Sequence, residues 1–387
     1  MDFSLTGEQR EIQALAREFA EAEIEPHAGE WDREHRFPEE LYSKLAEVGL
    51  MGVCVPEEHG GAGADFLSYV LVVEELSRAD ASVGVTVAVH TGACTLPILR
   101  YGSDEQKERF VPPLARGERL GAFALTEPES GSDAGALRTR ADAEGDGWTL
   151  SGTKQWISNG SYADTFLLFA RTDQDEPGAR GVSAFVLDRE HVQVTREEAK
   201  LGLNASSTAD LLLDGARAGR DRLLHEEGKG FTVAMTTLDG GRITVGAQAV
   251  GIAQAAYDVA RSYALERRQF GKRIAEFQAI QWKLADMATE IDAARLLVHR
   301  AAMLRQNGEP HTEAGAKAKL YASDVARRQT AEAIQVLGGY GYTKEFPLER
   351  YYRDAKVTEI YEGTSEIQRL VIARSILGLD RHAAAPR

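Results

Sequence analysis

The chain has 387 residues, of which 43% are hydrophobic and 27% are charged, and its formal net charge is −15. This composition fits two or three globular domains and excludes a disordered, collagen-like or purely coiled-coil chain. An acidic surface repels a phosphate backbone, which argues against nucleic-acid binding. The two cysteines, Cys54 and Cys94, provide neither a disulfide framework nor a zinc-ligand cluster, and no metal is expected.

The first residues of the chain contain no basic region followed by an apolar run. We therefore predict no signal peptide and a cytoplasmic location. The longest uncharged run, Ala81 to Leu99, includes hydroxyl side chains, His90 and Pro97. A membrane span needs about 20 predominantly apolar residues, so this mixed polarity predicts a buried segment and no membrane insertion.

Residues 1–120 are predicted to form an N-terminal helical domain. Apolar residues recur at helical spacing after Thr6, which forms a candidate capping box with Gln9. Pro38 begins a second helix, which Gly49 ends. Further helices are predicted over 64–76, over 82–99 and after Ser103.

Residues 121–230 contain short apolar runs separated by turn residues, which predicts a small β-barrel or sandwich. The run Gly145-Asp146-Gly147 indicates a hairpin between 137–143 and 148–151. Further strands are predicted over 165–170, 181–187, 192–195 and 209–213.

Residues 231–387 return to helical patterning. Apolar residues from Ile280 to Ala301 alternate three and four apart, which is the period of a long bundle helix. Helices are predicted over 233–265, 277–306, 311–336 and 366–377. The fold class is therefore α+β and mainly α, with a helical domain, a middle β domain and a helix bundle in that order.

Common nucleotide-binding and hydrolase motifs are absent from the sequence. The glycine-rich segments 60–63 and 338–341 lack the third glycine of a dinucleotide-binding fingerprint, and 228–230 lacks the P-loop hydroxyl residue. No GxSxG motif is present. A Rossmann fold, a P-loop and a serine-hydrolase elbow are therefore not supported.

Two polar segments in the β region stand out. Phe123 to Asp133 runs from a strand into a turn rich in hydroxyls, which either binds a ligand or forms an ordinary strand-to-loop corner. Trp156 and Ser158 lie at a strand end. An aromatic face with a hydroxyl suits a flat heterocycle, although a core tryptophan beside a turn gives the same pattern.

A third segment surrounds Glu362. Ser365 and Gln368 form a candidate capping box, so the last helix is predicted to begin just after Ser365. Glu362 then lies in a loop ahead of the helix, beside Gly363. Its carboxylate either interacts with the helix dipole or serves as a general base in a cleft.

Two basic features complete the pattern. Arg242 interrupts an apolar helix and needs a partner if it is buried, and Asp239 is one helical turn away. The turn from Arg267 to Lys272 is either a solvated helix end or a source of positive charge for an anionic ligand.

In this order, the segments resemble the acyl-CoA dehydrogenase family of FAD flavoenzymes, and most closely its short-chain and branched short-chain members. The resemblance covers the chain from the first helix to the last. It implies a C-terminal four-helix bundle after the two other domains. The residues that carry it are 124–133, 152–159, 238–242, 266–271, 335–339 and 353–369.

The resemblance implies two groups of FAD-binding residues. Residues in the β domain line the flavin, and the hydroxyls of Thr126 and Ser158 bond to the isoalloxazine: Phe123, Leu125, Thr126, Ser132, Trp156, Ile157 and Ser158. Residues of the bundle hold the adenine and pyrophosphate across a subunit interface: Arg267, Phe270, Gln278, Gln335, Val336, Leu337, Gly338 and Gly339. Thr364 and Ser365, at a helix N-terminus, suit a polar portion of the cofactor.

The resemblance also implies the reaction. Glu362 removes the α-proton of an acyl-CoA while the β-hydrogen leaves as a hydride to the flavin. Some members carry the base just before the arginine of the bundle helix, where this chain has Gly241, so Glu362 has no competitor. The substrate is held by Ser132, Asp239, Arg242, Tyr361 and Gly363.

The implied function is dehydrogenation of a short- or medium-chain acyl-CoA, straight or branched, to the trans-2-enoyl-CoA in fatty acid β-oxidation. A homotetramer would pass its electrons to an electron-transfer flavoprotein. The segment Ser82 to Leu96, at the bottom of the acyl pocket by resemblance, contains no Lys or Arg, which argues against an ω-carboxylate substrate. The alternatives are an oxidase or flavin monooxygenase of the same fold, or a non-catalytic CoA-binding homologue.

Overall fold

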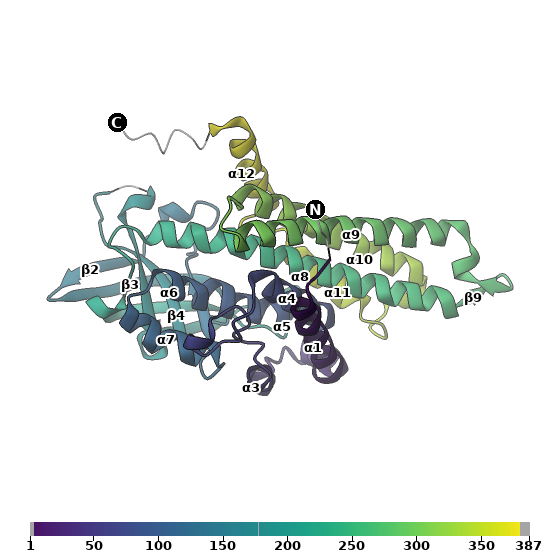
Figure 1. The fold of residues 1–387 in the computed structure, drawn as a ribbon, viewed down its shortest axis with the longest axis horizontal. Helices are drawn as coiled ribbons and strands as arrows, with labels where there is room; N and C mark the ends of the chain where they lie inside the picture. The colour runs from purple at the N-terminus through teal and green to yellow at the C-terminus, as the bar shows by residue number, and fades with distance from the viewer. Residues whose placement is uncertain (1–3, 177, 380–387) are drawn as a thin grey trace.

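The computed structural model describes residues 4–176 and 178–379. The molecule is elongated, with the sheet at one end and the far end of a long helix bundle at the other (Figure 1). The N-terminal helices pack along one side, against both parts. Gly121 begins the first strand and Gly230 begins the first bundle helix. The division into three independent domains, with boundaries at residues 120 and 230, remains a prediction.

The N-terminal part is helical, as the sequence predicts. The capping boxes of Thr6 with Gln9 and of Ser103 with Gln106 are both present. Asp65 caps the helix expected to begin at residue 64. The helices are α1 (Gly7–Glu23), α2 (Glu25–Glu34), α3 (Glu39–Glu47), α4 (Phe66–Ala79), α5 (Ala81–Val87), α6 (Leu96–Tyr101) and α7 (Asp104–Ala115), with the short η1 (Glu57–His59).

The segment from α5 to α6 is continuous through a π-helical stretch, η2 (Ala88–Thr95). The Tyr69 hydroxyl donates to the Ala88 carbonyl at 2.9 Å and the Thr95 hydroxyl to the His90 carbonyl at 2.8 Å, which supports the wider turn. By length and composition this segment is apolar enough to span a membrane, so the prediction that it is too polar was wrong. The protein buries 89% of its most apolar window, as expected of a core helix.

The middle part is a single hydrogen-bonded sheet with the order β6-β7-β3-β2-β4-β5-β8, and β1 pairs in parallel with β4. The predicted hairpin joins β2 to β3 and pairs Glu144 with Gly147. The strands are β1 (Gly121–Ala124), β2 (Arg140–Glu144), β3 (Gly147–Ser158), β4 (Thr165–Arg171), β5 (Val182–Asp188), β6 (Gln193–Glu197), β7 (Thr208–Gly219) and β8 (Leu223–Leu224). The sheet connections include η3 (Ala134–Ala136), η4 (Gly178–Gly181), η5 (Arg189–His191) and η6 (Arg220–Arg222).

The C-terminal part is a bundle in which α8, α9 and α10 pack against one another and α11 and α12 pack on α10. The predicted apolar seam is confirmed from Met287 to Ala301, because its side chains are buried. The elements are α8 (Gly230–Glu266), α9 (Gln278–Gln306), α10 (Thr312–Leu337), α11 (Leu348–Val357) and α12 (Ser365–Leu377). The ribbon β9 (Arg268–Gln269) with β10 (Lys272–Arg273), η7 (Ile274–Glu276) and η8 (Gly338–Tyr342) lie between them.

A polar junction joins the three parts beside α11. The Arg353 guanidinium pairs with Asp32 of α2 at 2.6 Å, and Asp32 also accepts from the Asn204 amide at 2.9 Å. The Asp354 carboxylate accepts from the Leu203 backbone N–H at 2.6 Å. Burial raises the pKa of Asp354 to about 7. These bonds anchor α11, and therefore the loop that follows it.

Candidate active site

Glu362 lies in the loop between α11 and α12, in an unusual backbone conformation. Its φ is 52° and that of Gly363 is 88°, so two consecutive residues are left-handed. Glycine adopts this conformation freely, whereas a glutamate there is uncommon and strained. The Gln368 side chain holds the turn, since its amide donates to the carbonyls of Glu362 at 3.2 Å and Gly363 at 2.8 Å.

The last helix begins one residue earlier than the sequence predicts. Thr364 is the N-cap, and its hydroxyl accepts from the Ile367 N–H at 3.4 Å. The capping box of Ser365 with Gln368 was therefore wrong, because the Gln368 side chain is bonded to the preceding loop. The left-handed Gly363 sets where the helix starts, and a hydroxyl pattern alone cannot distinguish two adjacent positions.

The Glu362 carboxylate lies directly against α8. A Cβ atom built at Gly241 would come within 1.8 Å of Glu362 Oε2, so only a residue without a side chain leaves room for it. This oxygen is buried, and no residue that the structure describes hydrogen-bonds to it. Burial raises the pKa of Glu362 to about 7, against the opposing charges of Lys319 and Arg242. A carboxylate with that pKa suits a general base at neutral pH.

Arg242 places a fixed positive charge near this base. It lies on α8 and is 6% exposed. Its Nη1 pairs with Asp239 Oδ1 at 2.5 Å, as the one-turn spacing predicts, and the Thr312 hydroxyl donates to Asp239 Oδ2 at 2.7 Å. The Nε of Arg242 is buried and makes no hydrogen bond among the described residues. One donor of this guanidinium is therefore free for a ligand.

The segment α5–η2–α6 is anchored between the Glu362 loop and the sheet. The Tyr361 hydroxyl donates to Gln248 Oε1, and the Gln248 amide donates to the Ala81 carbonyl at 2.9 Å. At the opposite side, the Asn159 amide donates to the Thr86 carbonyl at 3.1 Å. Burial raises the pKa of Tyr361 well above its usual range, so its hydroxyl remains protonated.

The predicted flavin-lining residues of the sheet lie together, and we call them the sheet cluster: Phe123, Leu125, Thr126, Ser132, Trp156, Ile157 and Ser158. The Gln155 N–H donates to the Thr126 carbonyl at 2.9 Å, which places the two segments side by side. Trp156 has a φ of 62° at a register shift of β3 and is 54% exposed.

The solvent-accessible groups of the sheet cluster fit a flat heterocycle. The hydroxyls of Thr126 and Ser158 make no hydrogen bond to another described residue, and the indole of Trp156 offers an open face. Leu125 and Ile157 are buried in the sheet core, so they present only backbone groups to a ligand. Ser132 is exposed in the turn that follows β1.

A buried ion pair that the sequence analysis missed supports the sheet cluster. Lys154 Nζ lies 2.7 Å from Glu127 Oε1 and 3.2 Å from the Leu125 carbonyl. Glu127 also accepts from the backbone N–H of Arg138 and Thr139. The strand alternation contained a signal, because Lys154 shares its face of β3 with the buried Trp148 and Leu150.

The substitution Lys154→Met is expected to destabilise the protein by about 3–5 kcal/mol, because it leaves the Glu127 carboxylate buried without its cation. The same change should weaken FAD retention, since Glu127 orders the turn that carries Thr126. Chemical unfolding and flavin content measure the two effects. The double variant Glu127→Gln, Lys154→Met should recover most of the stability, and an equally unstable double variant would contradict this interpretation.

The predicted adenine- and pyrophosphate-binding residues lie elsewhere, and we call them the bundle-end cluster: Arg267, Phe270, Gln278, Gln335, Val336, Leu337, Gly338 and Gly339. Helix α8 has 37 residues, and at about 1.5 Å per residue it is about 55 Å long. Arg242 lies in its first half, whereas Arg267 lies just beyond its end. Phe270 is 92% exposed, whereas the side chains of Val336 and Leu337 are buried.

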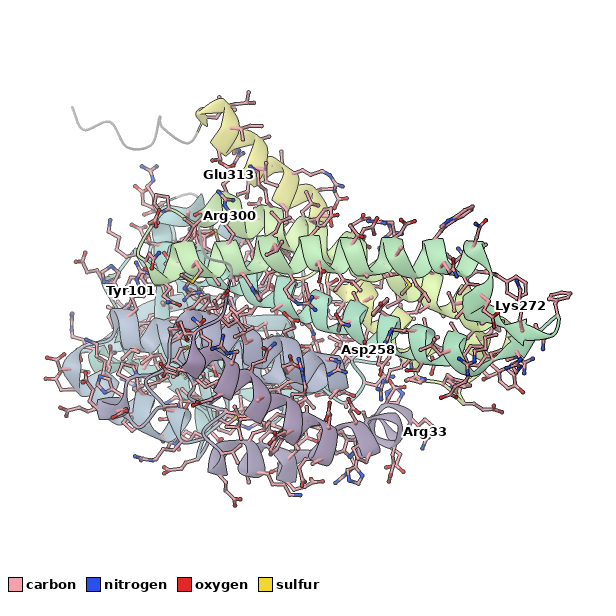
Figure 2. All side chains as sticks on the ribbon, turned by 45° about the vertical axis from the view of Figure 1, so that its right-hand side comes forward. Arg33, Tyr101, Asp258, Lys272, Arg300 and Glu313 are labelled. Atoms are coloured by element: carbon pink, nitrogen blue, oxygen red, sulfur yellow. The ribbon has the colours of Figure 1, made fainter. Side chains whose placement is uncertain are left out.

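The two clusters lie at opposite ends of the molecule. The sheet strands and β9 are at the two extremes of the long axis in Figure 1. Figure 2 shows the same separation, because Tyr101 lies near the sheet and Lys272 lies at the far end of the bundle. One chain therefore brings Glu362, Tyr361, Gly363, Asp239 and Arg242 together with the segment 81–101, but it separates the sheet cluster from the bundle-end cluster.

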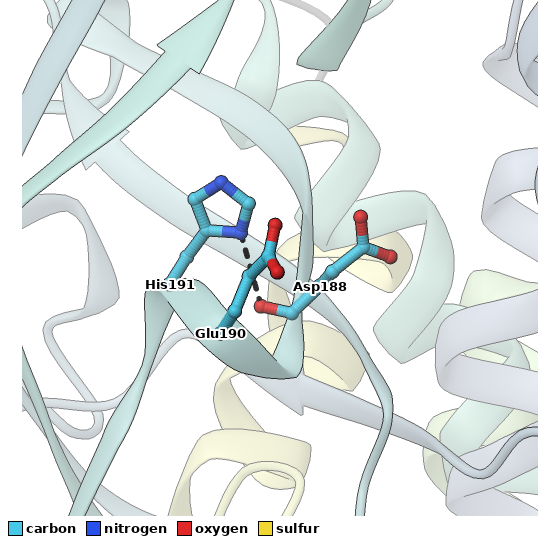
Figure 3. A group of neighbouring side chains, drawn as sticks. All are labelled: Asp188, Glu190 and His191. Atoms are coloured by element: carbon cyan, nitrogen blue, oxygen red, sulfur yellow. Dashed lines mark hydrogen bonds between the residues drawn. The ribbon is translucent and has the colours of Figure 1, made fainter.

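Asp188, Glu190 and His191 form the one group of three possible metal ligands among the residues that the structure describes (Figure 3). His191 Nδ1 lies 3.2 Å from the Asp188 carbonyl. The Asp188 carboxylate is already paired with Arg222 at 2.7 Å and Arg119 at 2.9 Å. These guanidinium groups occupy the carboxylate and repel a cation, so the group is explained as an ion-pair cluster.

A cleft of about 960 Å³ lies between α2, α4, α8 and α11, away from Glu362. Arg33 and Asp258, both labelled in Figure 2, line it together with other side chains of both charges. Of the predicted site residues, Arg267 borders this cleft. The cleft is therefore not the place where Glu362 would act.

Family comparisons match nearly the whole chain. Residues 6–118 match "Acyl-CoA dehydrogenase, N-terminal domain", residues 122–216 match the middle domain and residues 228–377 match the C-terminal domain. The chain is 48% identical to the short-chain specific acyl-CoA dehydrogenase of Clostridium acetobutylicum, over 97% of this chain and 100% of the relative.

Solved structures agree with this match. The butyryl-CoA dehydrogenase of Megasphaera elsdenii superposes with a TM-score of 0.96 at 45% identity, over 97% of this chain and 100% of that one. A chain from a structural study of the electron transferring flavoprotein of Acidaminococcus fermentans gives a TM-score of 0.96 at 47% identity, with the same coverage. The chain thus belongs to the acyl-CoA dehydrogenase family of FAD-dependent oxidoreductases.

Proposed function

We propose that this protein dehydrogenates a short-chain acyl-CoA to the trans-2-enoyl-CoA and that Glu362 is its catalytic base. One observation carries the proposal: Oε2 of the Glu362 carboxylate is buried without a hydrogen-bond partner among the described residues, and it lies against α8 where Gly241 leaves room for it. A structural carboxylate in that position would be expected to have a hydrogen-bond partner. The short-chain and butyryl-CoA relatives support the choice of substrate.

The residues around Glu362 and those of the sheet cluster have different roles in the proposed reaction. FAD, when bound, supplies the acceptor for the substrate β-hydrogen as a hydride. The Glu362 carboxylate receives the α-proton, and the protonated Tyr361 beside it is held by its hydrogen bond to Gln248. Arg242, with Asp239, Gly363 and Ser132, holds the CoA portion of the substrate. Thr126, Trp156 and Ser158 hold the flavin ring, together with the backbone of their neighbours in the sheet cluster.

A second copy of the chain completes the FAD site. The sheet and bundle-end clusters lie at opposite ends of the long axis of one chain, so we infer that one chain does not use both on the same cofactor. The highly exposed Phe270 is explained if a neighbouring subunit covers it. We infer a homotetramer of the family type. In it, the bundle-end cluster, together with Thr364 and Ser365, binds FAD at the subunit interface.

The physiological setting follows from the relatives. We propose that an electron-transfer flavoprotein accepts the electrons, because a chain of such high similarity comes from a structural study of that protein. We also propose a role in fatty acid β-oxidation and a cytoplasmic location, on the basis of family membership and of the bacterial relatives.

The test is the visible absorbance of the purified protein, recorded without oxygen before and after butyryl-CoA is added. We expect an oxidised-flavin band that bleaches. Acetyl-CoA is the matched control, since its acyl group has no β-carbon and cannot be dehydrogenated. A flavin band that is unchanged by butyryl-CoA would contradict the short-chain assignment, and a protein that binds no flavin would contradict the enzyme.

The same preparation separates the dehydrogenase from an oxidase of this fold. Oxygen consumption on addition of butyryl-CoA should remain near background, whereas an artificial electron acceptor should restore turnover. Rapid oxygen uptake would show that the enzyme transfers its electrons to oxygen.

A further inference from the structure

Lys319 of α10 is a fully buried lysine beside the Glu362 loop. Its side chain is 0% exposed, and lysines are almost never buried without a partner. Its ammonium donates to the Gly363 carbonyl at 2.5 Å. No carboxylate of the described residues lies within ion-pair distance of it. The charge is therefore held next to the active-site loop by a backbone carbonyl.

The bonded carbonyl belongs to the strained turn. The Gly363 carbonyl accepts from Lys319 and from the Gln368 amide, so two donors from two helices fix its direction. Glu362 precedes it with a φ of 52°, which a glutamate does not adopt without support. The two bonds hold the peptide that directs the Glu362 side chain towards Gly241.

The charge of Lys319 also acts on Glu362. Burial lowers the pKa of Lys319 to about 8, and the charge of Glu362 opposes that effect. The other titratable and charged groups that act on this pair are Arg242 of α8, Tyr69 of α4, and Tyr361, Glu359 and Glu366 around the loop. Of the charges that favour ionised Glu362, Lys319 contributes the most and Arg242 follows.

We propose that Lys319 is a positioning residue: its ammonium fixes the Gly363 carbonyl, and its positive charge favours the ionised carboxylate of Glu362. The proposal rests on the proposed function, since it assigns Lys319 a task towards the base of that reaction. Lys319 thus has two distinct tasks. Its hydrogen bond to Gly363 orients the Glu362 carboxylate, and its charge influences the protonation of that carboxylate.

Three variants test the two tasks. Lys319→Met removes the bond and the charge, Lys319→Gln keeps an amide donor without the charge, and Lys319→Arg keeps a charge. Lys317→Met is the matched control on the same helix, because the Lys317 side chain is 41% exposed and pairs with Glu313. The rate of flavin reduction by butyryl-CoA is measured in single turnovers from about pH 6 to about pH 9.

In the wild type we expect the rate to rise with pH around a midpoint near 7, because the base must be deprotonated. Loss of the charge should move this midpoint up by about one unit in Lys319→Met and Lys319→Gln, which lowers the rate at pH 7 about fivefold. The high-pH plateau should fall further in Lys319→Met than in Lys319→Gln. Lys319→Arg should restore the midpoint, and Lys317→Met should match the wild type.

Infrared spectra provide a readout that needs no turnover. The C=O stretch of protonated Glu362 is the band that disappears in Glu362→Gln, and its titration reports the same midpoint. If butyryl-CoA fails to reduce the wild type while this band shifts in Lys319→Met, the proposed function fails and the role of Lys319 stands. A midpoint unchanged in both Lys319→Met and Lys319→Gln, or FAD lost from both, would overturn the inference.

Discussion

Replacing Glu362 by glutamine should abolish turnover while FAD stays bound. The amide has nearly the same size as the carboxyl group, so it fits against Gly241, but it cannot accept the α-proton. A positioned base contributes about 10²–10⁴-fold to a rate, and we expect flavin reduction by butyryl-CoA to fall by at least that factor. Stopped-flow absorbance without oxygen measures the rate, and the flavin-to-protein ratio confirms that the cofactor is retained.

Glu366→Gln is the control for this substitution. Glu366 lies on the first turn of α12, four residues further along, and its side chain is exposed. Its variant should reduce flavin at close to the wild-type rate, because solvent screens the exposed Glu366 charge from the Lys319–Glu362 pair. Undiminished activity in Glu362→Gln would instead favour a flavin monooxygenase of the same fold, which does not need this base.

Gly241→Ala should inactivate the enzyme without unfolding it. The three atoms closest to a Cβ at this position all belong to the Glu362 carboxyl group, at 1.8, 2.7 and 3.2 Å. The flexible end of a side chain can move aside, and alanine favours a helix over glycine by about 1 kcal/mol, so stability should be kept. The displaced base loses its alignment, and an error of about 1 Å can lower a rate about 10²-fold.

Thermal unfolding and flavin reduction are measured together on this variant. Gly29→Ala in α2 is the matched control, because its nearest neighbour, the end of the Arg33 side chain, is at an ordinary contact distance of 3.6 Å. The control should be fully active. If Gly241→Ala reduces flavin normally, Glu362 must reach the substrate from another direction.

Local patterns in the sequence predicted most of the helices and strands. The capping box at Thr6, the helix start after Ser103, the hairpin at Gly145 and the apolar seam of α9 depend on residues a few positions apart. The same local signals were insufficient for the Ala81–Tyr101 segment. Its composition predicted a buried segment, but not that it contains a π-helical stretch supported by Tyr69 from another helix.

The sequence identified the residues of the candidate site, but it did not identify most of the residues that hold them in place. Family resemblance assigned Glu362 its role, which one sequence alone left open. The groups that hold it come from distant parts of the chain: Lys319 approaches from α10 and Gln248 from α8. Such pairings depend on tertiary packing. The Thr364 cap was missed for a related reason, since the preceding left-handed turn decides it.

The contact between Gly241 and Glu362 has an evolutionary consequence. A side chain at position 241 of α8 would extend to the place that the Glu362 carboxylate occupies from the loop. The reaction requires a carboxylate at this place, and a residue of the helix or of the loop could supply it. An acid gained at 241 while Glu362 remained would place two carboxylates in one buried site, where like charges disfavour ionising both. Any transfer of the base must therefore lose one carboxylate as it gains the other. Homology-based assignment of active enzymes in this family should accordingly examine both positions together, because a side chain at position 241 and the Glu362 carboxylate extend to the same place.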